Sequence, residues 1–175
     1  MLVQQLVNTL DVELDADELA DCEALASWLR ERGLLSGGDP LGEGDLERTR
    51  TFREALRVLL DEHADTAQRT AAAAALATAA PAALLRVAFA ADGEPSLEPA
   101  AAGLDGALAA LLAIIDRAAC DGTWARLKIC AEHSCRYAFY DSSRNRSGNW
   151  CVMSVCGNRA KARSYRERRR SAPAA

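Results

Sequence analysis

The 175-residue sequence lacks the features that mark membrane and secreted proteins. No run of uncharged apolar residues reaches the roughly 18 that a membrane span requires. Its start, MLVQQLVNTLDVELD, has no basic opening, no long apolar stretch and no small-residue cleavage site of a secretory signal. We therefore expect no membrane association and a place in the cytoplasm, where clustered cysteines serve as metal ligands or redox groups rather than as disulfides.

Motifs of catalysis are also missing from residues 1–123. This segment has a single histidine, no glycine-rich phosphate loop and no nucleophile beside a recognisable base. This segment could sense a small-molecule effector, but no residues of its sequence indicate a binding pocket. We therefore do not expect an enzyme.

Acidic and basic residues are distributed unequally, although the net charge of the chain is only −4. Residues 1–123 carry nine arginines and 22 Asp or Glu, a balance of −13. Residues 124–175 carry 12 Lys or Arg against three acids, a balance of +9. This asymmetry predicts an acidic domain followed by a segment that meets a polyanion; ion pairing between the two parts is the alternative.

Four segments of residues 1–123 combine helical spacing of apolar residues with good helix formers: 15–33, 45–63, 66–80 and 104–122. We expect the first helix to begin with a capping box formed by Asp15 and Glu18. Gly33, Pro81 and Gly122 should end helices, because glycine suits a helix C-terminus and proline cannot continue the hydrogen-bond ladder.

The segment between the last two predicted helices has a different sequence pattern. LLRVAFA, ADGEP and SLEPAA indicate two short strands around a turn with Asp92 and Gly93, and hence a hairpin near residues 83–101. Cys22, on the apolar face of the first helix, and Cys120, at the end of the last, are assigned structural roles. The expected fold of residues 1–123 is mainly α, a helical domain with one β-hairpin.

The other four cysteines are paired in the sequence. Cys130 and Cys135 have four residues between them, as do Cys151 and Cys156, and fifteen residues separate the pairs. This spacing fits one tetrahedral zinc ion with four thiolate ligands, which leaves no open position and makes the zinc structural. His133 as a ligand, an iron–sulfur cluster and four metal-free thiols are the alternatives.

Residues 124–170 are too few and too polar to fold on apolar burial alone, so zinc would supply the missing stability. After Cys156, GNRAKARSYRERRR predicts a terminal helix whose positive end lies beside the thiolates, where Gly157 lets the backbone approach them. A knuckle, a short hairpin and a ligand-bearing basic helix make a treble-clef-like module. We expect a disordered tail at residues 171–175.

These residues resemble a known family. CAEHSCRYAFYDSSRNRSGNWCVMSVCGNRAKARSY is similar to the CGNR zinc finger, named for the tetrapeptide at residues 156–159 here. LVNTLD at residues 6–11, with SWLRERGLL downstream, resembles the ABATE domain, an α-rich domain with a β-hairpin that precedes this finger. The resemblance implies a bacterial, stress-responsive transcription regulator whose finger binds zinc through the four cysteines and meets DNA.

The resemblance makes Arg159 and Lys161 the basic positions of the motif. The chain departs from the pattern at Gly148 and Asn149, where many members have basic residues before the tryptophan. Any phosphate contact made there in the family would be absent from this chain.

The terminal helix should carry a basic stripe. At 100° per residue, its members lie within about 60° of one another, and they are Arg159, Arg163, Arg166 and Arg170. Such a stripe matches a nucleic-acid backbone, although Lys161 and Arg168 fall on the opposite side. The alternatives are a frayed, solvated tail and, for Arg159, hydrogen bonds to the backbone of the finger.

We therefore expect a zinc-dependent DNA-binding transcription regulator that contacts DNA through Arg159, Lys161, Arg163, Arg166 and Arg170. An RNA-binding module is the first alternative, since no residue separates major-groove from RNA-loop recognition. The second is a protein-interaction module whose finger docks on an acidic surface, such as its own domain.

Overall fold

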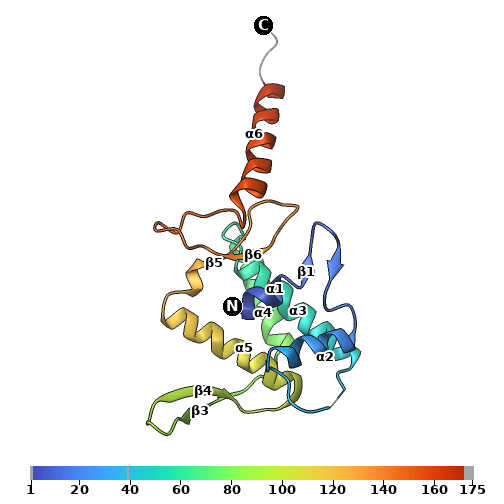
Figure 1. Ribbon diagram of the computed structural model, residues 1–175, viewed down its shortest axis with the longest axis vertical. Helices are drawn as coiled ribbons and strands as arrows, with labels where there is room; N and C mark the ends of the chain where they lie inside the picture. The colour runs from blue at the N-terminus through green and yellow to red at the C-terminus, as the bar shows by residue number, and fades with distance from the viewer. Residues whose placement is uncertain (1, 39, 172–175) are drawn as a thin grey trace.

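The computed structural model describes residues 2–38 and 40–171 (Figure 1). Six α-helices lie in this part of the chain: α1 (Leu2–Val7), α2 (Cys22–Glu31), α3 (Glu43–Leu59), α4 (Thr66–Ala79), α5 (Gly103–Cys120) and α6 (Asn158–Ser171). Three two-stranded antiparallel sheets accompany them: β1–β2 (Leu10–Asp11 and Ala16–Asp17), β3–β4 (Leu85–Phe89 and Pro95–Pro99) and β5–β6 (Leu127–Ile129 and Ala138–Tyr140). The mainly α fold with a small C-terminal module is confirmed.

The described chain has two parts. Residues 2–123 form the body, in which α1 to α5 pack together, and residues 124–171 form the finger. Helix α6 projects from one end of the long axis, and the β3–β4 hairpin projects from the opposite end (Figure 1). The tail expected at residues 171–175 lies outside the described residues, apart from Ser171, which ends α6.

Helix α2 begins later than the sequence suggested. Its N-cap is Asp21, whose carboxylate accepts a hydrogen bond from the backbone N–H of Ala24 at 2.8 Å. The capping box of Asp15 and Glu18 was therefore wrong. Asp15 has a left-handed φ of 52° between the short strands β1 and β2, so this hairpin occupies the residues that would form the first helical turns.

The other helices follow their sequence signals. Asp65 and Gln68 form a reciprocal capping box at the start of α4. Helix α5 ends at Cys120, near the expected stop at Gly122, whereas α3 ends at Leu59, before the predicted end at residue 63. Strands β3 and β4 pair from Leu85↔Pro99 to Phe89↔Pro95, as the hairpin prediction requires.

The main apolar core lies between the helices of the body. Its fully buried members include Leu6, Leu25, Leu29, Phe52, Leu56, Leu108 and Leu111. Helix α1, which the sequence analysis did not anticipate, supplies three buried residues, Val3, Leu6 and Val7. The same core includes Leu127, Ile129 and Ala138 of the β5–β6 hairpin, so the first part of the finger packs within the body.

Two cysteines differ from their expected environments. Cys120 is exposed rather than structural, and Cys22 is half-buried, with its thiol donating to Glu43 Oε1 at 3.5 Å. No helix within residues 2–38 and 40–171 is both long and apolar enough to span a membrane.

Candidate metal centre and basic helix

The first cysteine pair lies in the loop that joins β5 to β6. Cys130 follows β5, and its backbone N–H donates to the carbonyl of Tyr137 at 2.8 Å. The N–H of Cys135 donates to Glu132 O at 2.9 Å, and Arg136 takes a left-handed φ of 57°. The loop is thus a tight knuckle that turns both sulfur atoms to the same side.

The second pair lies at the start of α6. Cys151 precedes the π-helical turn η2 (Met153–Gly157), which contains Cys156 and continues into α6. The N–H of Cys156 donates to Val152 O at 2.9 Å. A hydrogen bond of 2.8 Å from Ala131 N to Asn149 O joins the two segments and brings the second pair against the knuckle.

The four sulfur atoms form one cluster. Sγ atoms of Cys130, Cys135, Cys151 and Cys156 all lie within 4.8 Å of one another. The Cys135–Cys151 and Cys151–Cys156 sulfur distances are 3.6 and 3.7 Å. Tetrahedral zinc with bonds of about 2.3 Å requires sulfur atoms about 3.8 Å apart. The cluster is therefore able to hold one zinc ion, and His133, which is exposed, is not part of it.

The pKa values of the thiols reflect their burial and their closeness to one another. Burial and the neighbouring thiols raise the pKa of Cys156 to about 11, and burial raises the pKa of Cys151 as well. Burial acts the same way on Cys130, but backbone N–H groups of Cys151 and Glu132 outweigh it and lower the pKa of that thiol. Four thiolates this close repel one another, and a divalent cation would stabilise all of them.

Gly157 lies against the side chain of Met153. A Cβ atom there would lie 2.5 Å from Sδ of Met153, so the glycine leaves room for this side chain. The methionine covers the turn that leads into α6.

A rigid loop follows β6. The buried carboxylate of Asp141 accepts hydrogen bonds from the N–H groups of Ser143 at 2.9 Å and Gly148 at 2.8 Å. Hydrogen bonds from Ser143, with further ones from Gly148 and Lys128, hold the pKa of this carboxyl well below its usual range. A Cβ at Gly148 would lie 2.8 Å from the carboxylate. This position therefore favours glycine, whereas the family pattern often has a basic residue there.

The finger is joined to the body by ion pairs. Buried Lys128 lies 3.1 Å from Glu62 and 3.2 Å from Asp141, and Arg136 lies 2.7 Å from Asp61. The ion pairing considered as an alternative from the charge asymmetry is thus present in part. Five of the twelve basic residues of the finger contact acids or carbonyls outside their own helix: Arg126, Lys128, Arg136, Arg159 and Arg163.

The N-terminal LVNTLD stretch takes part in the same joint. Asn8 accepts a hydrogen bond from Ala138 N at 2.7 Å and donates to Ala138 O at 3.0 Å. Asp11 accepts one from the Tyr137 hydroxyl at 2.8 Å. Two side chains of this stretch therefore bind the finger directly, Asn8 at strand β6 and Asp11 at the end of the knuckle loop.

The predicted basic stripe is divided. Arg159 forms an ion pair with Glu13 of the body at 2.8 Å, and not with the backbone of the finger. Arg163 lies 2.5 Å from the buried carboxylate of Glu132, and this hydrogen bond lowers the pKa of Glu132. Both contacts fix the start of α6, one against the β1–β2 hairpin and the other against the knuckle.

The remaining basic residues are exposed. They are Lys161, Arg166, Arg168, Arg169 and Arg170 on α6 and Arg144 and Arg146 in the loop after Asp141. Arg146 has a left-handed φ of 52°, and its carbonyl accepts a hydrogen bond of 2.5 Å from Lys128. Arg144 and Arg146 were not predicted as contacts, although their place in a short, polar, basic loop could have indicated them.

Comparison with known families agrees with this division of the chain. The model of the CGNR zinc finger matches residues 126–169. The ABATE model, described as "Putative stress-induced transcription regulator", matches residues 1–122, more than half of the chain. A search of curated proteins finds no match. Both resemblances drawn from the sequence are confirmed: the chain belongs to the ABATE family and carries a CGNR zinc finger after the ABATE domain.

Proposed function

We propose that the protein is a zinc-dependent, DNA-binding transcription regulator of the bacterial cytoplasm, and that it acts by binding rather than by catalysis. The observation that carries the proposal is the exposed basic surface of α6 and the loop after Asp141. This surface remains exposed although Arg159 and Arg163, at the base of α6, form ion pairs with acids. Four thiolate ligands would leave zinc no position for a substrate, so the metal has a structural role.

The outer part of α6 is unusual for a helix of a folded protein. It projects away from the body (Figure 1), and its residues from Ser164 to Arg170 are exposed. A helix that is polar on every face gains little from packing, and four arginines in five residues repel one another. Phosphate groups of a nucleic acid would relieve this repulsion. A 14-residue helix is about 21 Å long, enough to lie along a groove of duplex DNA.

The inner residues of the stripe have a different role in this proposal. Zinc and the Glu132–Arg163 pair hold the base of the helix, so that the outer cations and the loop cations keep fixed positions. Lys161, Arg166 and Arg170 are the DNA contacts that we retain from the sequence analysis. Arg144 and Arg146 are added to them, and Arg159 becomes available once Glu13 releases it.

Duplex binding by single variants tests the proposal. Arg166→Gln and Arg170→Gln should weaken binding and flatten the plot of log affinity against log salt concentration by about 0.9 each, because one phosphate contact is lost. Arg86→Gln, on the exposed face of the β3–β4 hairpin, is the matched control and should change neither quantity. Arg163→Gln should instead loosen the finger, measured as faster zinc release to a chelator.

The same assay with RNA distinguishes the first alternative. Tighter binding of single-stranded RNA than of duplex DNA by the full chain, at equal salt, would contradict DNA as the partner. Binding with no dependence on salt to either polymer would contradict the nucleic-acid proposal as a whole.

A further inference from the structure

The β3–β4 hairpin has one apolar face. In its register, one set of cross-strand pairs shares a side of the sheet: Leu85↔Pro99, Val87↔Leu97 and Phe89↔Pro95. The opposite side carries the ion pair between Arg86 and Glu98, at 3.1 Å. The hairpin is therefore amphipathic, as a sheet that covers a core would be.

Much of this face is uncovered. Val87 is 62% exposed and Phe89 is 72% exposed, whereas Leu85 and Pro99, at the base of the hairpin, are half-buried. The segment holds four of the large apolar side chains that are exposed in the described chain: Leu84, Val87, Phe89 and Leu97. A two-stranded sheet is marginally stable alone, and clustered exposed apolar side chains indicate an interaction surface.

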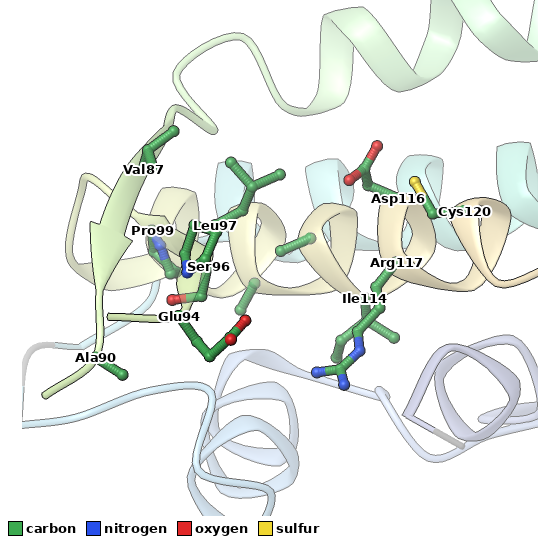
Figure 2. Close-up of a pocket in the computed structure, with 13 residues that line it drawn as sticks. Val87, Ala90, Glu94, Ser96, Leu97, Pro99, Ile114, Asp116, Arg117 and Cys120 are labelled. Atoms are coloured by element: carbon green, nitrogen blue, oxygen red, sulfur yellow. The ribbon is translucent and has the colours of Figure 1, made fainter. Parts of the chain in front are cut away.

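A cleft of about 840 Å³ lies between the hairpin and α5 (Figure 2). Its hairpin wall includes Val87, Leu97 and Pro99, and its helix wall includes Ala110, Ala113 and Ile114. The alanines are small, so the helix wall leaves room for side chains from another molecule. The molecule thus has a projecting apolar arm and, beside it, an apolar cleft.

The charges around the cleft are self-complementary. Glu94 stands on the hairpin side and Arg117 on the helix side (Figure 2). Among the described residues, the side chain of Glu94 has no hydrogen-bond or ion-pair partner, whereas Arg117 interacts electrostatically with Asp121. A second acid, Asp116, also lines the helix side of the cleft. A partner that fits must place a base near Glu94 and an acid near Arg117. A second copy of the same surface, turned by a two-fold axis, offers both at once.

We propose that the occupant of this cleft is a second copy of the chain, in a dimer formed by mutual insertion of the β3–β4 hairpins. The apolar face of each hairpin enters the cleft of the other copy, and Glu94 of each copy meets Arg117 of the other. The hairpin and α6 lie at opposite ends of the long axis (Figure 1), so the dimer leaves both basic helices and both metal centres uncovered. The proposal does not depend on DNA binding.

Sedimentation of the full, zinc-loaded chain over a concentration series tests the dimer. The wild type should pass from the 18.7 kDa mass of one chain to twice that mass as concentration rises. Phe89→Asp should keep the single-chain mass. Leu14→Asp, a matched change at a side chain that is 74% exposed in the β1–β2 hairpin, should behave as the wild type. A wild type that stays at the single-chain mass, or a Phe89→Asp variant that still dimerises, would overturn the proposal.

Charge exchange identifies the occupant. Glu94→Arg and Arg117→Glu should each raise the dissociation constant of the dimer about tenfold or more, because each creates two like-charged contacts. The double variant Glu94→Arg/Arg117→Glu should regain the wild-type constant, since both ion pairs form again with reversed sign. Circular dichroism checks that each variant is folded. A double variant as weak as the single ones, or a native mass spectrum of single chains carrying a small apolar ligand, would contradict a second copy as the occupant.

Discussion

The body and the finger are stabilised in different ways. The body has a continuous apolar core to which α1, α2, α3 and α5 each contribute, with side chains such as Phe52 and Leu108 fully buried. The separate cluster of the finger has four buried members, of which three are metal-ligating cysteines and the other is Phe139. The body can therefore fold by burying apolar surface, whereas the apolar cluster of the finger is small and is built around four cysteines that are able to hold one zinc ion.

The β5–β6 hairpin lies at the boundary between the body and the finger. Leu127, Ile129 and Ala138 follow the body in sequence but belong to its core. Lys128 alternates with them and turns to the acids Glu62 and Asp141. The β5–β6 hairpin is thus a shared element: one side belongs to the core of the body, and the other carries Lys128 together with Phe139 of the finger's cluster.

Removing one zinc ligand should have the largest effect. Cys151→Ser should abolish zinc binding and unfold the chain from about residue 130 onward, because structural zinc contributes on the order of 10 kcal/mol in small fingers. The body and strand β5 should remain folded. Hydrogen exchange by mass spectrometry measures this, with fast exchange expected from about residue 130 onward and unchanged protection in α3 and α5.

Cys120→Ser is the matched control, since this thiol is exposed and outside the cluster. It should leave zinc content and exchange unchanged. Loss of protection across the whole body in Cys151→Ser would show that the two regions form one cooperative unit, contrary to the comparison above.

A cavity in the shared hairpin should have the next largest effect. Ile129 is 5% exposed in the core of the body, so Ile129→Ala should lower the free energy of unfolding of the body by about 2–5 kcal/mol. Val155, in the finger and 45% exposed, provides the control, and Val155→Ala should cost well under 1 kcal/mol. Urea denaturation followed by far-UV circular dichroism measures both, and equal effects would place Ile129 outside the core.

The metal site was the part of the molecule most open to prediction. Ligands that come in two short-range pairs, such as Cys130 with Cys135, can be recognised from their local spacing in the sequence. The amphipathic helices and the β3–β4 hairpin are local patterns of the same kind. Helix α2 marks the limit, because Asp15 and Asp21 both suit an N-cap, and the β1–β2 hairpin decided between them.

The contacts between body and finger could not be predicted in this way. Arg159 and Glu13 are 146 positions apart, and the local sequence around either residue does not indicate that the other is its partner. The helical period placed Arg159 and Arg163 on one stripe with Arg166 and Arg170. It did not reveal that the first two would be held by acids, because that depends on where the knuckle and the β1–β2 hairpin lie.

Releasing Arg159 should have a smaller effect, of opposite sign. Glu13→Gln removes the acid that competes with DNA for this arginine, so duplex affinity should rise, by at most about fivefold for an exposed pair. Glu23→Gln makes the same charge change at an exposed site of α2 and corrects for net charge. An equal rise in both variants would show that Arg159 makes no contact with DNA.

The smallest effect concerns the contact between Asp11 and Tyr137. The hydrogen bond to Asp11 raises the pKa of Tyr137 to about 12, above its ordinary value of 10.0. The bond therefore stabilises the fold fully below pH 10, and its contribution is lost as the pH rises toward 12. Asp11→Ala should bring the pKa of Tyr137 down toward 10, measured from phenolate absorbance after subtraction of a Tyr137→Phe titration. An unchanged titration would exclude this contact in solution.

The central claim is that a zinc-folded finger, docked on the acidic body, presents basic residues to DNA. Fluorescence anisotropy of a labelled duplex, titrated with the full chain with and without zinc over a salt series, tests it most directly. With about five phosphates contacted, by Lys161, Arg166, Arg170, Arg144 and Arg146, the zinc-loaded chain should give a slope of log affinity against log salt of about −4.5. Zinc removal should weaken binding at least about tenfold, since the cations then lose their common surface. Equal binding with and without zinc, or none that varies with salt, would contradict the claim.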